Sequence, residues 1–150
     1  MIELSKIALV NWHLFDVEDI DVHGDVGIIG ANRSGKSTIL DLIQTVFTGA
    51  SKEYLRLNAS ANESGQKRGG RTVHAYCLGR LGEGDATVRK ESLTYLALSF
   101  RDSTGKRKPV SIGLAIEAKR SESQERILAR FVLEGAEVTS RDFIDTDKAG

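Results

Sequence analysis

Residues 27–42 read GIIGANRSGKSTILDL, where a short apolar run meets a glycine, a small polar turn and then a helical pattern. The apolar run, residues 26–29, predicts a strand that is buried on both faces. A helix is expected after the turn, because apolar residues recur at helical spacing: Ile39, Leu42, Ile43 and Val46. Gly49 follows them and is suited to a left-handed cap at the end of the helix.

The turn between strand and helix fits the pattern G-x-x-x-x-G-K-[ST] at every fixed position of residues 30–37. Glycines let backbone N–H groups surround a polyphosphate, and the helix directs the positive end of its dipole at the anion. Lys36 is predicted to contact the β- and γ-phosphates as the catalytic residue, and the Ser37 hydroxyl to coordinate Mg²⁺. We call this predicted ATP–Mg²⁺ site the phosphate cradle; its residues are Gly30, Ala31, Asn32, Arg33, Ser34, Gly35, Lys36, Ser37 and Thr38.

Arg33 is the unusual residue of the cradle, because many loops of this class carry a glycine at that position. An arginine there places a long cationic side chain at the mouth of the site. It can contact a phosphate, or it can point to solvent or a partner surface, and the usual exposure of arginine favours the second interpretation.

Composition is that of an ordinary soluble domain of 150 residues, with 40% hydrophobic and 28% charged residues and a formal net charge of zero. Cys77 is the single cysteine, so no internal disulfide can form, and a reducing cytoplasmic location is expected. No signal peptide or membrane-length apolar run is present in the sequence. With no net charge, nucleic-acid contacts must come from local basic clusters, and one of these is Lys67, Arg68 and Arg71. The alternative is that such clusters are solvated surface.

Alternating apolar residues predict strands at residues 6–12 and 15–22, the second with a bulge. Three more strands are expected at 93–100, 109–118 and 126–135, joined by polar turns as an antiparallel meander. The last of them is expected to place four residues on one face: Ile127, Ala129, Phe131 and Leu133.

The remaining segments give weaker patterns. Residues 51–70 are polar and glycine-rich and are expected to form a loop, and 71–82 a short helix that ends at a glycine. Residues 138–150 have no strong pattern. The predicted fold class is therefore α/β with α+β character, in which an antiparallel meander lies beside the strand and helix of the cradle.

The order of these elements resembles the amino-terminal lobe of an SMC-like, ABC-type ATPase head. The stretches ALVNWHLF, GANRSGKSTILDLIQTVFTG and GRTVHAYCLGRLG are most similar to the bacterial MukB, MksB and JetC lineage of condensin-like proteins. JetC is the SMC-like subunit of the Wadjet plasmid-defence system. The resemblance covers most of the chain and is most specific over residues 7–49.

The resemblance implies a longer protein than residues 1–150, with further subunits. Heads of this family are completed by a carboxy-terminal lobe after a coiled coil, so the chain is expected to be an amino-terminal fragment that is inactive alone. Two heads then enclose ATP and act on DNA by loop extrusion, in chromosome organisation or plasmid defence. The implied partners are a second head, kleisin-like and winged-helix (KITE-like) subunits and a nuclease subunit, in a bacterial, nucleoid-associated complex without a membrane.

Further site residues come from the same resemblance. In related heads the loop after the first strand approaches the nucleotide, and the resemblance places Asn11 and Trp12 in that loop. Trp12 is therefore expected to face adenine or ribose; the alternative is a core anchor. Arg71, with Lys67 and Arg68, lies where related heads carry an arginine-bearing loop that links DNA to ATP. No glutamine could be assigned to the metal-coordinating position of the family.

Two other function classes remain open from the sequence. One is a self-contained P-loop enzyme such as a small kinase, which requires a parallel sheet and is disfavoured by the meander. The other is a non-catalytic nucleic-acid-binding module, which is disfavoured by the zero net charge and the complete phosphate pattern. A natural reading frame that continues for many hundreds of residues would favour the split head over both.

Overall fold

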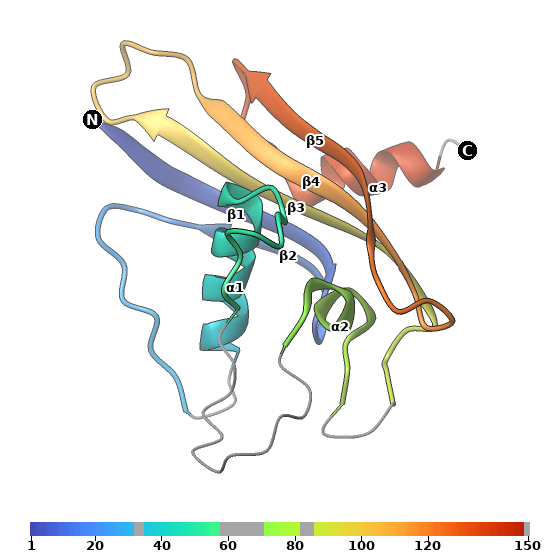
Figure 1. Ribbon diagram of the computed structural model, residues 1–150. Coiled ribbons are helices and arrows are strands. Elements are labelled where there is room, and N and C mark those ends of the chain that lie inside the picture. The colour runs from blue at the N-terminus through green and yellow to red at the C-terminus, as the bar shows by residue number, and fades with distance from the viewer. Residues whose placement is uncertain (32–34, 58–70, 82–85, 149–150) are drawn as a thin grey trace.

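The computed structural model describes residues 1–31, 35–57, 71–81 and 86–148. Its centre is a five-stranded antiparallel sheet with the order β2-β1-β3-β4-β5 (Figure 1). The strands are β1 (Ile2–Trp12), β2 (Phe15–Asp21), β3 (Glu91–Asp102), β4 (Val110–Lys119) and β5 (Arg126–Glu134). The helices are α1 (Lys36–Phe47), α2 (Val73–Leu78) and α3 (Ser140–Lys148). The predicted meander is confirmed, because β3, β4 and β5 pair in sequence order and antiparallel.

Helices cover both faces of this sheet, with α1 and α2 on one face and α3 on the other (Figure 1). The larger core lies under α1 and α2 and includes Leu9, Trp12, Leu42, Val46, Tyr76, Leu96, Leu98, Leu114 and Ile116. The smaller core lies on the α3 side and joins Ala8, Ala97 and Val138 to Phe131 and Phe143. Two interior strands, β1 and β3, therefore contribute residues to the cores on both faces.

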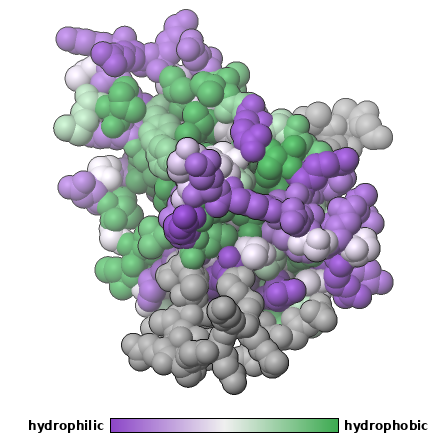
Figure 2. All heavy atoms as spheres, in the orientation of Figure 1, coloured by the Kyte–Doolittle hydropathy of each residue, from purple (hydrophilic) through white to green (hydrophobic). Residues whose placement is uncertain are grey.

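Residues 26–29 do not form the buried strand that the sequence predicted. They have no regular secondary structure, and their apolar side chains are exposed, with 95% of Ile29 accessible. Figure 2 shows hydrophobic side chains on the left of this face, where the segment runs in Figure 1. A strand needs a neighbour to pair its backbone groups, and no strand of the described residues lies alongside this segment.

The predicted bulge in the second strand is also wrong. β2 pairs with β1 without interruption, from Lys6 opposite Asp21 to Trp12 opposite Phe15. β2 is an edge strand with mostly exposed residues, so burial does not impose a strict apolar alternation on it. The bulge lies instead in β1, where the pairing with β3 shifts register near its start.

A second bulge corrects the predicted face of β5. Ala115 of β4 is opposite Ala129, whereas the next residue, Ile116, is opposite Ile127. The extra residue in β5 turns Ile127 to the α1 side and leaves Phe131 on the α3 side. The apolar residues of β5 therefore do not share one face as their spacing predicted.

The two predicted helices are confirmed and a third was missed. α1 ends with Gly49 in the left-handed region, at φ 61°, and α2 ends at Gly79, at φ 69°. α3 begins after Thr139, whose backbone N–H and hydroxyl both donate to Asp142. A Thr with an acidic residue three positions later is a sequence-readable start for a helix that has little apolar periodicity. None of the three described helices has the length and apolar character needed to cross a membrane.

Candidate phosphate cradle

Gly35 makes the turn from the cradle into α1. Its φ is 95°, in the left-handed region, and a Cβ at this position would lie 3.1 Å from Cζ of Phe15. Both constraints favour glycine, one through the backbone and the other through the β2 side chain above it. Asn32, Arg33 and Ser34 lie outside the described residues, so their predicted contacts, including that of Arg33, stay predictions.

Lys36 folds back over the loop that precedes it. Its Nζ donates hydrogen bonds to the carbonyl oxygens of Gly30 and of Ala31, the second at 3.3 Å. The ammonium group is thus held within the turn by exposed carbonyl groups. Because these bonds face solvent, a phosphate oxygen can replace them without leaving a buried group unpaired.

The first turn of α1 is fixed from below by Trp12. The indole N–H donates to the carbonyl oxygen of Thr38 at 3.0 Å, and the Trp12 ring has no exposed surface. The ring also stacks on Tyr76, with centroids 4.6 Å apart. Trp12 is therefore a core residue beneath the start of α1, in agreement with the core-anchor alternative.

Asn11 and Trp12 were expected in a loop, and this placement is wrong. Both belong to β1, which extends through Trp12. Asn11 has a left-handed φ of 55°, and its side-chain amide donates to the carbonyl oxygen of Leu93 at 2.9 Å. A role for Asn11 at the nucleotide stays a prediction.

A buried hydrogen bond joins α1 to α2 near the cradle. The Tyr76 hydroxyl donates to Oδ2 of Asp41 at 2.5 Å, and both residues are at most 4% exposed. Burial, followed by the bond to Asp41, raises the pKa of the Tyr76 hydroxyl above its usual value. The sequence pattern pointed to neither residue, although Thr38, Asp41 and Thr45 form a polar row at helical spacing within α1. Such a row indicates buried polar contacts.

The predicted DNA-binding cluster is only partly described. Lys67 and Arg68 lie outside the described residues. Arg71 lies two residues before α2, where its Nη1 donates to the Tyr76 hydroxyl at 3.1 Å and its guanidinium stands 5.9 Å from the Tyr76 ring centre. The structure therefore connects Arg71 to the aromatic core under the cradle.

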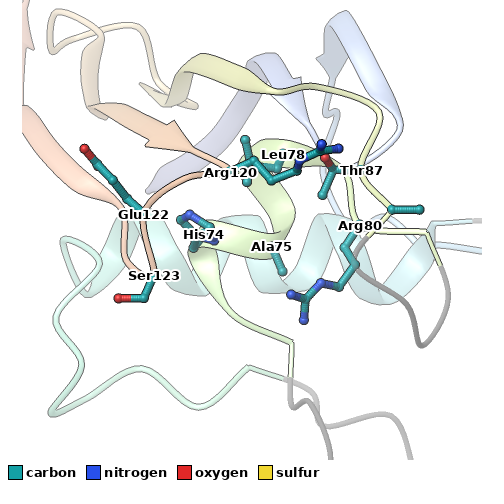
Figure 3. A pocket seen from close by; sticks show the side chains of 9 residues that line it. His74, Ala75, Leu78, Arg80, Thr87, Arg120, Glu122 and Ser123 are labelled. Carbon is teal, nitrogen blue, oxygen red and sulfur yellow. The ribbon is translucent and has the colours of Figure 1, made fainter.

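A hollow of about 720 Å³ lies away from the cradle, between α2 and the turn from β4 to β5 (Figure 3). His74 stands at its centre, where Nε2 donates to the carbonyl oxygen of Lys119 at 2.9 Å. Arg80 and Arg120 contribute guanidinium groups and Glu122 a carboxylate. The two guanidinium groups can attract an anion, so the hollow is an alternative to the cradle as a phosphate-binding site. No metal-ligating group of three or more side chains occurs in the part of the chain that the structure describes.

Comparison with known proteins gives one family match and a similar solved structure. The family model for the P-loop containing region of an AAA domain matches residues 4–64, which include β1, β2, the cradle and α1. No curated protein matches the chain. A solved chain from work on ATP-driven dimerization and DNA-stimulated activation of SMC ATPases superposes with a TM-score of 0.49 and 19% identity, over 97% of this chain and 78% of that chain. The family match therefore covers the part of the chain that carries the phosphate pattern, and the mixed α/β fold agrees with the predicted fold class.

Proposed function

We propose that this chain is the ATP-binding amino-terminal lobe of an SMC-like ATPase head. The observation that carries the proposal is the complete phosphate pattern of residues 30–37, with the left-handed Gly35 opening directly into α1. This arrangement presents the first-turn N–H groups of a helix to an anion, which is the usual way a P-loop binds phosphates. The P-loop family match over residues 4–64 supports the same function.

Lys36 and Ser37 are proposed to have separate roles at the cradle. The Lys36 ammonium moves from the Gly30 and Ala31 carbonyls to the β- and γ-phosphates and stabilises their charge. Ser37 is half-buried in the first turn of α1, and its hydroxyl oxygen is the kind of hard ligand that Mg²⁺ prefers. When bound, the ion neutralises phosphate charge. The start of α1 contributes the orientation of the triphosphate.

The head is proposed to be completed by further chain. The apolar residues 26–29 are exposed beside the cradle, which is unfavourable in water and is relieved if strands of a carboxy-terminal lobe pair with this segment. We further propose that the completed head belongs to the MukB, MksB and JetC lineage and that two such heads dimerise around ATP. Kleisin-like, KITE-like and nuclease subunits would be its partners, and DNA its substrate.

Replacing Lys36 with alanine is expected to weaken ATP–Mg²⁺ binding by about 1.5–3 kcal/mol, or roughly 10- to 150-fold in Kd. The reason is the loss of a charge-assisted hydrogen bond to phosphate. Isothermal titration calorimetry of the chain with ATP and Mg²⁺ measures this change. Lys52→Ala is a matched control, because it removes a lysine whose Nζ bonds to Gln124, outside the cradle. Equal affinity of the Lys36→Ala and wild-type chains would refute the assignment.

Neutralising Lys67 and Arg68 is expected to weaken DNA binding by the assembled protein and to leave ATP affinity unchanged. Each lost phosphate contact should reduce the slope of log K against log salt by about 0.9. Fluorescence anisotropy with a duplex DNA across a salt titration measures the slope. The control is neutralisation of Lys106 and Arg107, which carry the same charge in the exposed turn after β3. An identical slope for both double variants would make the first cluster ordinary solvated surface.

A further inference from the structure

We infer that Trp12, Tyr76 and Asp41 are positioning residues for the phosphate cradle: they fix α1 in place without contacting the nucleotide. The inference deepens the proposed function and depends on it for its effect on ATP binding. It begins from a physical requirement. The first N–H groups of a helix have no partners within the helix, so the direction in which they point depends on contacts that hold the first turns.

Two contacts hold the first turns of α1 from the same side. The Trp12 indole N–H donates to the Thr38 carbonyl oxygen at 3.0 Å, and the Tyr76 hydroxyl donates to Oδ2 of Asp41 at 2.5 Å. Thr38 and Asp41 are three residues apart and therefore neighbours on one helix face. Two anchors on one face prevent α1 from rotating or sliding, and Lys36 belongs to the same first turn.

The two anchors also support each other. The rings of Trp12 and Tyr76 are stacked at 4.6 Å with an interplanar angle of 24°. The backbone N–H of His13 donates to the Tyr76 carbonyl oxygen at 2.6 Å, which ties α2 to the end of β1. Because β1 is an interior strand of the sheet, the anchors connect the start of α1 to the sheet.

Arg71 completes this network from the solvent side. Its Nη1 donates to the same Tyr76 hydroxyl that donates to Asp41, at 3.1 Å. Tyr76 therefore connects one cation near the surface to the carboxylate on α1. The hydrogen bond from Arg71 polarises the Tyr76 hydroxyl. The hydroxyl is therefore a stronger hydrogen-bond donor to the buried Asp41.

The test compares Tyr76→Phe with Ser111→Ala. The first variant keeps the stacked ring and removes the hydroxyl. The second removes a hydroxyl with no exposed surface on the other side of the sheet, where it donates to the Ala136 carbonyl oxygen at 2.9 Å. Hydrogen exchange without nucleotide should be about tenfold faster for residues 36–43 in Tyr76→Phe, and unchanged there in Ser111→Ala. Asp41→Asn serves as a second variant if Tyr76→Phe folds poorly.

Nucleotide binding gives the second measurement. The Kd for ATP–Mg²⁺ should rise about tenfold in Tyr76→Phe and stay at the wild-type value in Ser111→Ala. Trp12 is the only tryptophan of the chain, so its fluorescence reports on the first turn of α1 directly. ATP–Mg²⁺ should change its emission in the wild-type chain, and less so in Tyr76→Phe.

The outcomes separate the inference from the proposed function. If Tyr76→Phe leaves both the exchange of residues 36–43 and the ATP affinity at wild-type values, the positioning role is overturned. If exchange increases as expected but the wild-type chain does not bind ATP, the anchors on α1 are supported and the proposed function is refuted.

Discussion

Replacing Trp12 with alanine is expected to lower the free energy of unfolding by about 3–5 kcal/mol, which is a large part of the stability of a small domain. The Trp12 side chain is fully buried between β1, α1 and α2. Its loss removes the stacking on Tyr76 and leaves the Thr38 carbonyl oxygen without its indole donor. The substitution also opens a cavity that the surrounding side chains fill only in part.

Chemical denaturation followed by circular dichroism measures this loss without relying on tryptophan emission. Leu14→Ala is the control, because Leu14 lies in the adjoining turn and is 56% exposed, so its change should stay within about 0.5 kcal/mol. Trp12→Phe should fall between the two, since it keeps an aromatic ring but not the N–H. A loss below about 1 kcal/mol for Trp12→Ala would contradict the core position of this residue.

ATP hydrolysis by residues 1–150 alone is expected to be no faster than in a Lys36→Ala control. Phosphoryl transfer requires charge stabilisation and positioning from several directions, and removal of one such donor typically costs a factor of about 10²–10³. The cradle supplies one wall of such a site. Hydrolysis at least about a hundredfold faster is expected once the proposed carboxy-terminal lobe and a second head close the site.

Phosphate release at several protein concentrations tests this expectation, with the chain alone and with the product of the full natural reading frame. The completed protein should show a rate that rises more than linearly with concentration, because two heads must meet. Robust turnover by the 150-residue chain, abolished by Lys36→Ala, would indicate a self-contained NTPase. The split-head proposal would then have to be abandoned.

The elements that were predicted correctly depend on local patterns. The helical spacing of Ile39, Leu42 and Val46 predicts α1, and a glycine suited to a left-handed cap, Gly79, predicts the end of α2. The meander follows from alternation within each of three strands. Those patterns are short-range, so the sequence is sufficient to read them.

The elements that were missed depend on partners elsewhere in the chain. Residues 26–29 have the composition of a buried strand, but composition does not show whether a pairing strand is present. The register shift opposite Ala115 and Ile116 changes which side of β5 is buried, and it has no mark in the sequence of β5. α3 is different, because its start depends on a local contact between Thr139 and Asp142, which are only three residues apart.

At the candidate site, the sequence predicted the groups that would contact phosphate and not those that support them. Lys36 and Ser37 belong to a contiguous pattern. Asp41 and Tyr76 are 35 residues apart, and Trp12 is 26 residues from the Thr38 carbonyl oxygen that it binds. Long-range contacts of this kind become visible only when β1, α1 and α2 are packed together.

The most direct test of the central claim is a nuclear magnetic resonance titration of the ¹⁵N-labelled chain with ATP and Mg²⁺. If the phosphate cradle binds the triphosphate through its backbone N–H groups, the largest shifts will occur at the amides of residues 30–38, with smaller ones at the Trp12 indole N–H. Unchanged cradle amides, with the largest shifts instead at His74, Arg80 and Arg120 around the hollow beside α2, would contradict the account.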